Sequence, residues 1–243
     1  MKLLHVSDLH FRAHWFEWVA EQSRYYDAVC LSGDLLDMFS IHQTPLRAQS
    51  KWVREWLRQF PGRLFVCSGN HDWWDADGVV DTDAHCCWLD KMARPEVTVD
   101  GQGAYCGEYF IFCHPFRFPT GWPQAPQGKW ILLHHLPPAS ARTAIGGTGD
   151  NDNGDPELAD VLTTAARPPW IVLSGHVHKP KSWWDKCGSV WSLNPAFDAT
   201  ASFPNHITID TGLGVVTWIT ERTSGDAETV MDLGGCGPNH HGL

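Results

Sequence analysis

The sequence predicts an α/β protein, and two observations carry this prediction. Short apolar runs alternate with helical patterns in the first part of the chain, an order typical of a parallel sheet covered by helices. Further along, short Gly-punctuated apolar runs predominate and indicate additional β-strands. The sequence shows no internal repeat and no dividing linker. We therefore expect one domain over residues 1–222 and a polar tail over residues 223–243, whether or not that tail packs on the domain.

The first part contains three predicted strands, each followed by a polar loop. Residues 2–6, 28–31 and 64–67 are apolar runs that end at Ser-Asp, Ser-Gly-Asp and Ser-Gly-Asn, respectively. Helices are predicted for residues 15–22 and 45–60. In the longer helix, apolar residues recur at spacings of three and four until a Pro-Gly pair ends it.

The remainder is predicted to be mostly β-structure. Strands are expected at residues 97–99, 104–106, 109–113, 130–133, 171–173, 182–184, 189–193, 206–209 and 215–219. The first three favour antiparallel pairing because they are short and punctuated by Gly. One helix is expected over residues 156–166, where Pro occupies the first turn.

Composition and charge narrow the class of protein. With 43% hydrophobic and 19% charged residues, the 243-residue chain resembles an ordinary globular protein that needs no disulfides to stabilise its core. The formal net charge of -10 argues against sequence-independent binding to duplex nucleic acid, which depends on Lys and Arg. It does not exclude a nuclease whose metal ions supply the positive charge.

The sequence also predicts a compartment. No run of about 18 apolar residues occurs and the first residues lack the apolar stretch of a signal peptide, so we expect no membrane segment. The eight Cys residues include no C-x-x-C pair, and several lie in apolar strands. We interpret them as reduced thiols of a cytoplasmic protein.

Fourteen His residues are many for this length and indicate metal or acid–base chemistry. Polar groups follow five predicted strands directly: Asp8-Leu9-His10, Gly33-Asp34, Gly69-Asn70-His71-Asp72, His134-His135 and Gly175-His176-Val177-His178. Because ligands bind at the carboxyl ends of strands in α/β sheets, we expect these side chains to converge. Oxygen and imidazole donors favour Mn, Fe, Zn or Ni, and their number suits two ions that share a bridging ligand.

These blocks, in this order, resemble the motifs of the calcineurin-like metallophosphoesterase superfamily. They span residues 8 to 178, and Asn194-Pro195 resembles an element that often follows the last block. The resemblance implies a four-layer α-β-β-α sandwich, in which two mixed β-sheets pack face to face with helices outside. It also implies hydrolysis of phosphate esters with two metal ions, of which Mn is expected to support activity best.

The resemblance further implies a role for individual residues. The implied metal ligands are Asp8, His10 and His178 for one ion, Asp34 as the bridge, and Asn70, His134 and His176 for the other. A hydroxide between the ions would attack phosphorus in line while His71 assists the leaving oxygen. Asp37 and Asp72 would orient His side chains or order loops. His134 is preferred to His135 because it follows the strand more directly.

Taken singly, these residues have ordinary structural interpretations. Asp8 or Asp34 could cap a helix, Asn70 could be a turn residue, and His134 could be a buried core histidine. Arg12 suits either a phosphate contact or a solvated surface position. Trp73 suits either a substrate wall or core packing. The joint occurrence of seven candidate ligands at five strand ends favours the metal site over the separate structural interpretations.

The motifs also narrow the substrate. The block Gly69 to Asp72 ends in Asp where the Ser/Thr protein phosphatases carry Glu, and Met38-Phe39 stands where they carry Arg-Gly. The chain therefore looks closer to the phosphodiesterase and nuclease branch. A small nucleotide-like phosphodiester is the expected substrate. The alternatives are a nuclease acting on short or single-stranded nucleic acid, and a protein-binding scaffold that retains only the fold.

Overall fold

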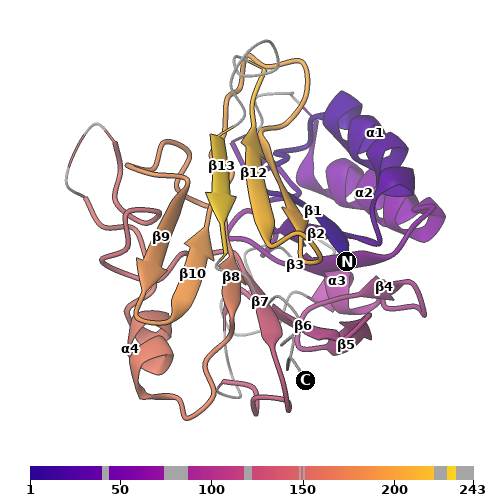
Figure 1. The fold of residues 1–243 in the computed structure, drawn as a ribbon. Coiled ribbons are helices and arrows are strands. Elements are labelled where there is room, and N and C mark those ends of the chain that lie inside the picture. The colour runs from indigo at the N-terminus through magenta and orange to yellow at the C-terminus, as the bar shows by residue number, and fades with distance from the viewer. Residues whose placement is uncertain are drawn as a thin grey trace.

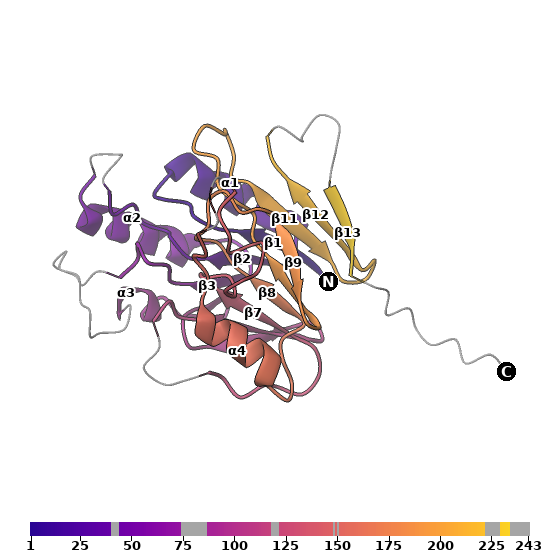
Figure 2. The same cartoon turned by 90° about the vertical axis from the view of Figure 1, so that its left-hand side faces the viewer.

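The computed structural model describes residues 1–39, 44–73, 87–117, 122–147, 149, 151–221 and 229–233. In these ranges two mixed β-sheets pack face to face, and helices cover their outer faces (Figures 1 and 2). The α/β sandwich that the resemblance implies is thus confirmed.

The first sheet has seven strands in the described part of the chain. In spatial order they are β13 (Thr229–Asp232), β12 (Val215–Ile219), β11 (His206–Asp210), β1 (Lys2–Val6), β2 (Ala28–Ser32), β3 (Leu64–Cys67) and β4 (Val97–Thr98). Strands β1 to β4 run parallel to one another, whereas β11, β12 and β13 each pair antiparallel with their neighbours. The carboxyl ends of β1, β2 and β3 therefore share one edge.

The second sheet has six strands in the same described ranges. They are β5 (Gly103–Cys106), β6 (Tyr109–His114), β7 (Trp130–His134), β8 (Ile171–Leu173), β10 (Val190–Leu193) and β9 (Trp184–Cys187), in spatial order. Strands β6, β7, β8 and β10 are parallel, and only the outer strands β5 and β9 pair antiparallel.

The antiparallel prediction for the three Gly-punctuated strands was correct only for the β5–β6 pair. Strand β4 is parallel to β3, and β6 is parallel to β7. A tight turn joins β5 to β6, which forces antiparallel pairing there. Strand β9 begins at Trp184, two residues later than predicted.

The helices cover the sheets from both sides. Helix α1 (Ala13–Gln22), the 3-10 helix η1 (Ser23–Tyr25), α2 (Leu46–Gln59) and the short α3 (Cys87–Asp90) accompany the first sheet, and α4 (Pro156–Thr164) accompanies the second. Val53 and Leu57 of α2 pack with alternate strand residues such as Leu4 in one apolar cluster. A further cluster joins Leu158 of α4 to Leu132 of β7.

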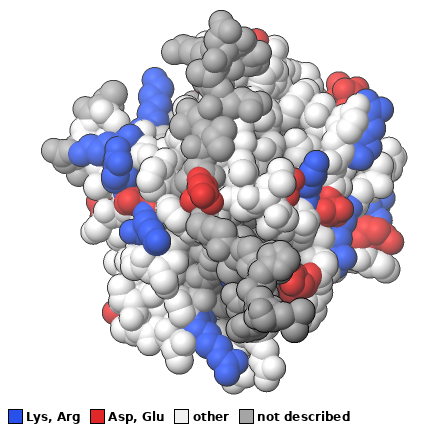
Figure 3. All heavy atoms as spheres, in the orientation of Figure 1, with Lys and Arg blue, Asp and Glu red and all other residues white. Residues whose placement is uncertain are grey.

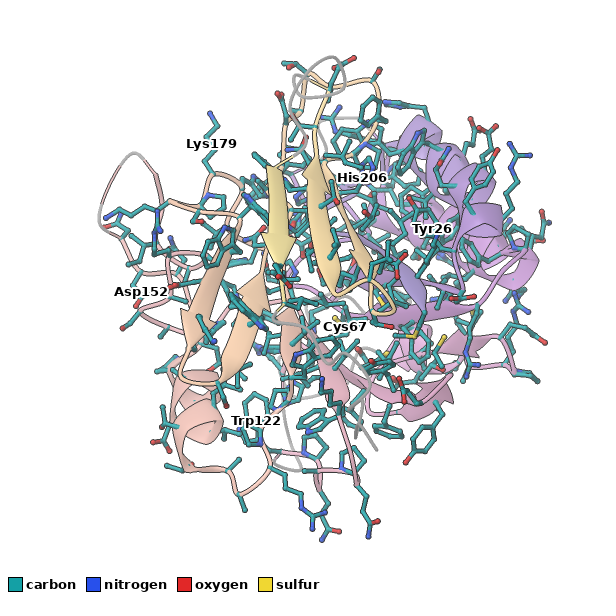
Figure 4. All side chains as sticks on the ribbon, viewed as in Figure 1. Tyr26, Cys67, Trp122, Asp152, Lys179 and His206 are labelled. Atoms are coloured by element: carbon teal, nitrogen blue, oxygen red, sulfur yellow. The ribbon has the colours of Figure 1, made fainter. Side chains whose placement is uncertain are left out.

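The core between the sheets comes from the opposite strand faces. Phe65 of the first sheet and Ile131 and Leu173 of the second are fully buried there. Cys67 lies in the same layer, near the centre of the molecule (Figure 4). Five described cysteines form no disulfide, as expected for reduced thiols.

One strand lies in the segment that the sequence assigned to a tail. Thr229–Asp232 forms β13 and pairs with β12, so this part of residues 223–243 is ordered on the sheet. Residues 222–228 and 234–243 lie outside the described ranges. No helix in the described ranges is long and apolar enough to cross a membrane.

Candidate metal centre

Five strand ends from both sheets meet at one edge of the sandwich and bring the predicted polar residues together. In the first sheet, Asp8 follows β1, Asp34 follows β2 and Asn70 follows β3. In the second sheet, His135 follows β7 and His176 follows β8. Most of these side chains are buried, and the two carboxylates are 1% and 2% exposed.

The first group joins the loop after β1 to the loop after β8. His178 Nε2 lies 3.5 Å from Asp8 Oδ1 and 3.1 Å from His10 Nε2. His10 Nε2 lies 3.8 Å from the same Asp8 oxygen. One carboxylate oxygen and two imidazole nitrogens thus lie close enough together to hold one metal ion.

The second group lies beside it and is centred on Asn70. The Asn70 Oδ1 atom lies 3.0 Å from His135 Nε2 and 2.9 Å from His176 Nδ1. His135 Nε2 is also 3.4 Å from Asp34 Oδ1. These four side chains offer two oxygens and two nitrogens, the donor types that suit a second borderline metal ion.

Asp34 lies between the two groups. Its Oδ1 is close to His135, whereas its Oδ2 lies 3.9 Å from His10 Nε2 and 3.8 Å from His71 Nε2. The backbone N–H of His71 donates to Asp34 Oδ1 at 2.9 Å, which fixes the carboxylate in this position. Asp34 is therefore placed to serve both groups, as a bridging ligand must.

Backbone geometry at the strand ends is unusual for residues with side chains. Asp8, His10, Asp34 and His176 all have positive φ, at 56°, 41°, 51° and 65°. This left-handed region is costly for non-Gly residues and persists where the surroundings impose it. The clustering of four such residues at one edge is typical of a functional site.

Two glycines allow the loops to approach this closely. A Cβ on Gly69 would collide with the Asp34 backbone nitrogen and Oδ1, and a Cβ on Gly175 would collide with Ser7 Oγ and Asp8 Oδ2. Asn194 then secures the loop after β8, because its Nδ2 donates to the carbonyls of Gly175 at 2.8 Å and Val177 at 3.1 Å.

The structure places His134, the ligand preferred to His135, away from the other predicted ligands. On β7, Leu133 faces the core between the sheets and Leu132 faces α4. Side chains alternate along a strand, so His134 shares the α4 side and His135 the inner side. His134 Nε2 lies 3.2 Å from Asp155 Oδ2, and its Nδ1 lies 3.1 Å from His114 Nδ1. His135, the alternative, lies beside Asn70 and Asp34.

His71 has one ring nitrogen engaged and the other aimed at the site. The backbone N–H of Met38 donates to His71 Nδ1 at 3.2 Å. In the neutral ring, Nε2 therefore carries the proton, and it points toward Asp34 Oδ2. Burial lowers the pKa of His71, although the charge of Asp34 opposes that shift.

Asp72 and Asp37 order the neighbouring loops. The carboxylate of Asp72 accepts hydrogen bonds from the backbone N–H groups of Gly69, Leu35 and Leu36, at 2.9 to 3.2 Å. Asp72 thereby ties the loop after β2 to the loop after β3. Burial, with the nearby charge of Asp34, raises the pKa of Asp72 to about 7. Asp37 accepts from the Phe39 N–H at 3.1 Å.

The two predicted substrate contacts occupy different positions. The Arg12 guanidinium lies 5.6 Å from the centre of the Phe197 ring, and that ring packs against His10 and His178. Arg12 is thus at the rim of the centre. Trp73 is only 8% exposed and belongs to the core on the α2 side of the first sheet, so its ring is mainly a packing element.

The buried carboxylates of the centre need positive charge beside them. Burial lowers the pKa of His135, but the nearby Asp34 and Asp8 outweigh it and raise that pKa to about 9. Burial likewise opposes ionisation of Asp8, yet its hydrogen bond with His178 and the surrounding histidines hold the pKa of Asp8 well below its usual range. Two ionised carboxylates buried among imidazoles fit a centre that binds cations.

Two features of this edge were not anticipated from the sequence. Phe197, which covers His10 and His178, has no motif of its own and lies two residues after Asn194-Pro195. The contacts of His134 with His114 and Asp155 are the second feature. The alternation of side chains along β7 separates His134 from His135. It identifies which of them faces the centre only once the inward face of the strand is known.

Comparison with known proteins agrees with this geometry. The family model for calcineurin-like phosphoesterases matches residues 1–180, and the chain belongs to this family. Members of the family depend on two metal ions. No curated protein sequence matches the chain.

Solved structures that are similar to this chain include three with named proteins, and TT1561 and PPD1 share its fold. TT1561 from Thermus thermophilus has 14% identity and a TM-score of 0.55, with 96% of this chain and 98% of that chain covered. The purple acid phosphatase PPD1 from yellow lupin seeds has 12% identity and a TM-score of 0.51, with 90% and 50% covered. YfcE, a phosphoesterase from E. coli, has 16% identity and a TM-score of 0.48, with 96% and 100% covered. At these identities the likeness concerns the fold.

Proposed function

We propose that this protein hydrolyses phosphate esters at a centre of two divalent metal ions and that its substrate is a small nucleotide-like phosphodiester. The observation that carries the proposal is the convergence of two buried carboxylates, an amide and four imidazoles from five strand ends. Asp8, His10 and His178 would hold one ion. Asn70, His135 and His176 would hold the other, with Asp34 shared between them.

Bound ions at this edge would polarise the phosphoryl oxygens and lower the pKa of a water molecule. The protein's own residues supply the remaining functions. Asp34 fixes the spacing of the two groups because it lies close to His10 of one group and to His135 of the other. Asn70 joins His135 to His176 within the second group. The donor set of oxygen and nitrogen suits Mn, Fe, Zn or Ni, and we propose Mn²⁺ as the ion to test first.

His71 is the proposed proton donor to the leaving oxygen. Its Nδ1 accepts from the Met38 N–H, which leaves a proton on Nε2 at the face of the centre. His71 lies beside the proposed ligands His10 and Asp34, and we assign its side chain to the leaving oxygen and not to an ion. Its loss should therefore affect turnover without removing the ions.

A diester is proposed over a monoester because the motif block of residues 69–72 departs from that of the Ser/Thr protein phosphatases. The net charge of -10 favours a small substrate over duplex nucleic acid. We also propose a cytoplasmic location, supported by the free and mostly buried thiols of the described cysteines.

The test compares bis-p-nitrophenyl phosphate with p-nitrophenyl phosphate, first in EDTA and then with added Mn²⁺. We expect metal-dependent turnover that favours the diester, and an Asp34→Asn control should be inactive. A preference for the monoester would replace the diester proposal with a phosphatase. Absence of turnover by folded protein with Mn²⁺, Fe²⁺, Zn²⁺ or Ni²⁺ would favour the scaffold alternative.

A short single-stranded oligonucleotide added to the same assay tests the nuclease alternative. Faster cleavage of the oligonucleotide than of small diesters would favour that alternative.

A further inference from the structure

A groove of about 840 Å³ opens beside the candidate metal centre. It begins at His178 and Phe197, which belong to the centre, and extends between the loop after β8 and the end of β12. The groove is therefore continuous with the place where a phosphate group would lie. Any substrate larger than the phosphate itself has room to extend in this direction.

Aromatic side chains form the wall of the groove. The rings of Trp183 and Trp218 lie nearly parallel, with an interplanar angle of 14° and centroids 6.1 Å apart. Trp218 Nε1 donates to the carbonyl of Pro195 at 2.8 Å, which fixes the orientation of its ring. Phe197 packs at 4.5 Å between ring centroids over His178. Fixed aromatic faces next to a phosphate site suit a planar organic group that stacks.

Polar and cationic groups complete the lining. Lys179 comes directly after His178, and Lys181 follows in the same loop. The Lys179 side chain extends into solvent from this loop (Figure 4). On the face shown in Figure 3, Lys and Arg side chains lie on both sides of the molecule, including the side that carries β9. Asn205 also lines the groove. It is 7% exposed, and its Oδ1 has no hydrogen-bond partner among the described residues.

The lining of the groove also contains two carboxylates. Glu221 accepts hydrogen bonds from the Ser202 N–H and hydroxyl, at 3.1 and 2.8 Å, and Asp198 accepts from Thr200. Both carboxylates line the groove. A long polyanion lying along the groove would meet these negative charges, which favours a substrate with a single phosphate group at the centre.

We propose that this groove binds the nucleoside part of a small phosphodiester, with its base against the Trp218 side of the wall and its phosphate next to His178. The inference rests on the proposed hydrolysis of phosphodiesters and names the class of substrate for it. An N–H of the base is the kind of donor that Asn205 lacks. Lys179 would attract the phosphate to the mouth of the groove.

The first test measures binding and does not depend on turnover. Calorimetric titration with thymidine 5′-monophosphate, with and without Mn²⁺, is compared for the wild type and four variants. Trp218→Leu should weaken binding by about tenfold or more, the effect of losing one stacked base. Lys179→Gln should weaken it a few-fold. The matched controls are Trp184→Leu and Lys186→Gln on β9, outside the groove. We expect the nucleotide affinity of both variants to lie within about twofold of that of the wild type.

The second test uses two diesters with the same leaving group, thymidine 5′-(p-nitrophenyl phosphate) and methyl p-nitrophenyl phosphate. Trp218→Leu should lower kcat/KM for the nucleoside ester about tenfold and leave that of the methyl ester nearly unchanged. Equal effects on both esters, or unchanged nucleotide binding in both groove variants, would overturn the inference.

The two proposals fail in distinguishable ways. If the wild type hydrolyses neither ester with any metal, the proposed function fails and the titration alone decides the groove. If both esters are hydrolysed at similar rates and nucleotide binds equally to wild type and variants, the proposed function stands and the groove assignment falls. If Trp218→Leu fails to fold, Lys179→Gln changes an exposed side chain and still tests the groove through its effect on nucleotide binding.

Discussion

The two faces of the second sheet at the end of β7 place neighbouring histidines in contrasting surroundings. His135, on the inner face, lies among Asp34, Asp8 and Asn70, and the carboxylates raise its pKa to about 9. On the outer face, His134 contacts His114 and Asp155. Burial and the neighbouring His134 lower the pKa of His114 well below its usual range.

This comparison shows that histidine count alone does not locate a metal site. Each group brings two histidine nitrogens within 3.1 Å of each other: His10 and His178 in the centre, and His114 and His134 on the outer face. Among the residues that the structure describes, the inner face alone also offers two buried carboxylates, and those carboxylates require cations. The outer group instead links β7 to Asp155, the residue before α4. Asp155 caps this helix because its side chain accepts hydrogen bonds from the backbone N–H groups of Glu157 and Leu158.

The largest predicted effect is that of Asp34→Asn on the inner face. The amide keeps the shape of the side chain but removes the charge shared by both groups of ligands. We expect loss of both metal ions and a fall in turnover of about 1,000-fold or more. Metal content by mass spectrometry and hydrolysis of bis-p-nitrophenyl phosphate measure the two effects. Full metal content in this variant would contradict the bridging position of Asp34.

His71→Ala should separate catalysis from metal binding. For a diester with an alcohol leaving group, such as thymidylyl-thymidine, we expect turnover to fall about 100-fold or more while metal content stays at the wild-type level. The loss should be smaller for p-nitrophenyl esters, because p-nitrophenolate leaves without needing a proton. Equal losses for both leaving groups, or loss of metal, would show that His71 does not donate the proton.

A third prediction concerns His206, a histidine that is buried away from the carboxylates of the metal centre. His206 packs against Trp18 and its Nδ1 lies 3.0 Å from the Pro204 carbonyl oxygen. Burial lowers the pKa of His206 to about 4. Below pH 6.5 the unfolded chain takes up the proton first, so stability falls as the pH falls from about 6.5 to 4 and then levels off.

This titration should contribute about 2–3 kcal/mol to the acid loss of stability. Urea unfolding at pH 7.5, 6, 5 and 4 measures it, with His206→Gln as the comparison. The variant should lose less stability over this range than the wild type. Parallel curves for the two proteins would show that His206 does not titrate in this way.

The smallest predicted effect tests the outer face directly. Asp155→Ala removes the cap of α4 and the partner of His134, and we expect a loss of about 1–2 kcal/mol in the free energy of unfolding. Metal content should be unchanged. Asp160→Ala on the exposed side of the same helix is the control and should change stability by less than about 0.5 kcal/mol. Loss of metal in Asp155→Ala would mean that the outer group supports the inner one.

Much of the site could be predicted because its residues follow apolar strands directly. Asp8, Asp34, Asn70 and His176 stand where a strand ends, and parallel strands bring such ends to one edge. The choice between His134 and His135 required the inward face of β7, and a fully apolar strand such as Trp130–Leu133 does not reveal it. Strand β13 was missed because it is short and separated from β12 by polar residues.

The groove could not be predicted at all. Trp183, Asn205 and Trp218 come from three segments that only the packed sheets bring together. Each of these residues taken singly has an ordinary role in packing or in a turn.

The most direct test of the metal centre is the metal content of two matched variants, His135→Ala and His134→Ala. Both change one histidine at the end of the same strand. Purified protein is reconstituted with Mn²⁺, freed of unbound ions and analysed by mass spectrometry. We predict two ions per chain for the wild type and for His134→Ala, and at most one for His135→Ala. Loss of metal from His134→Ala with full content in His135→Ala would contradict the centre described above.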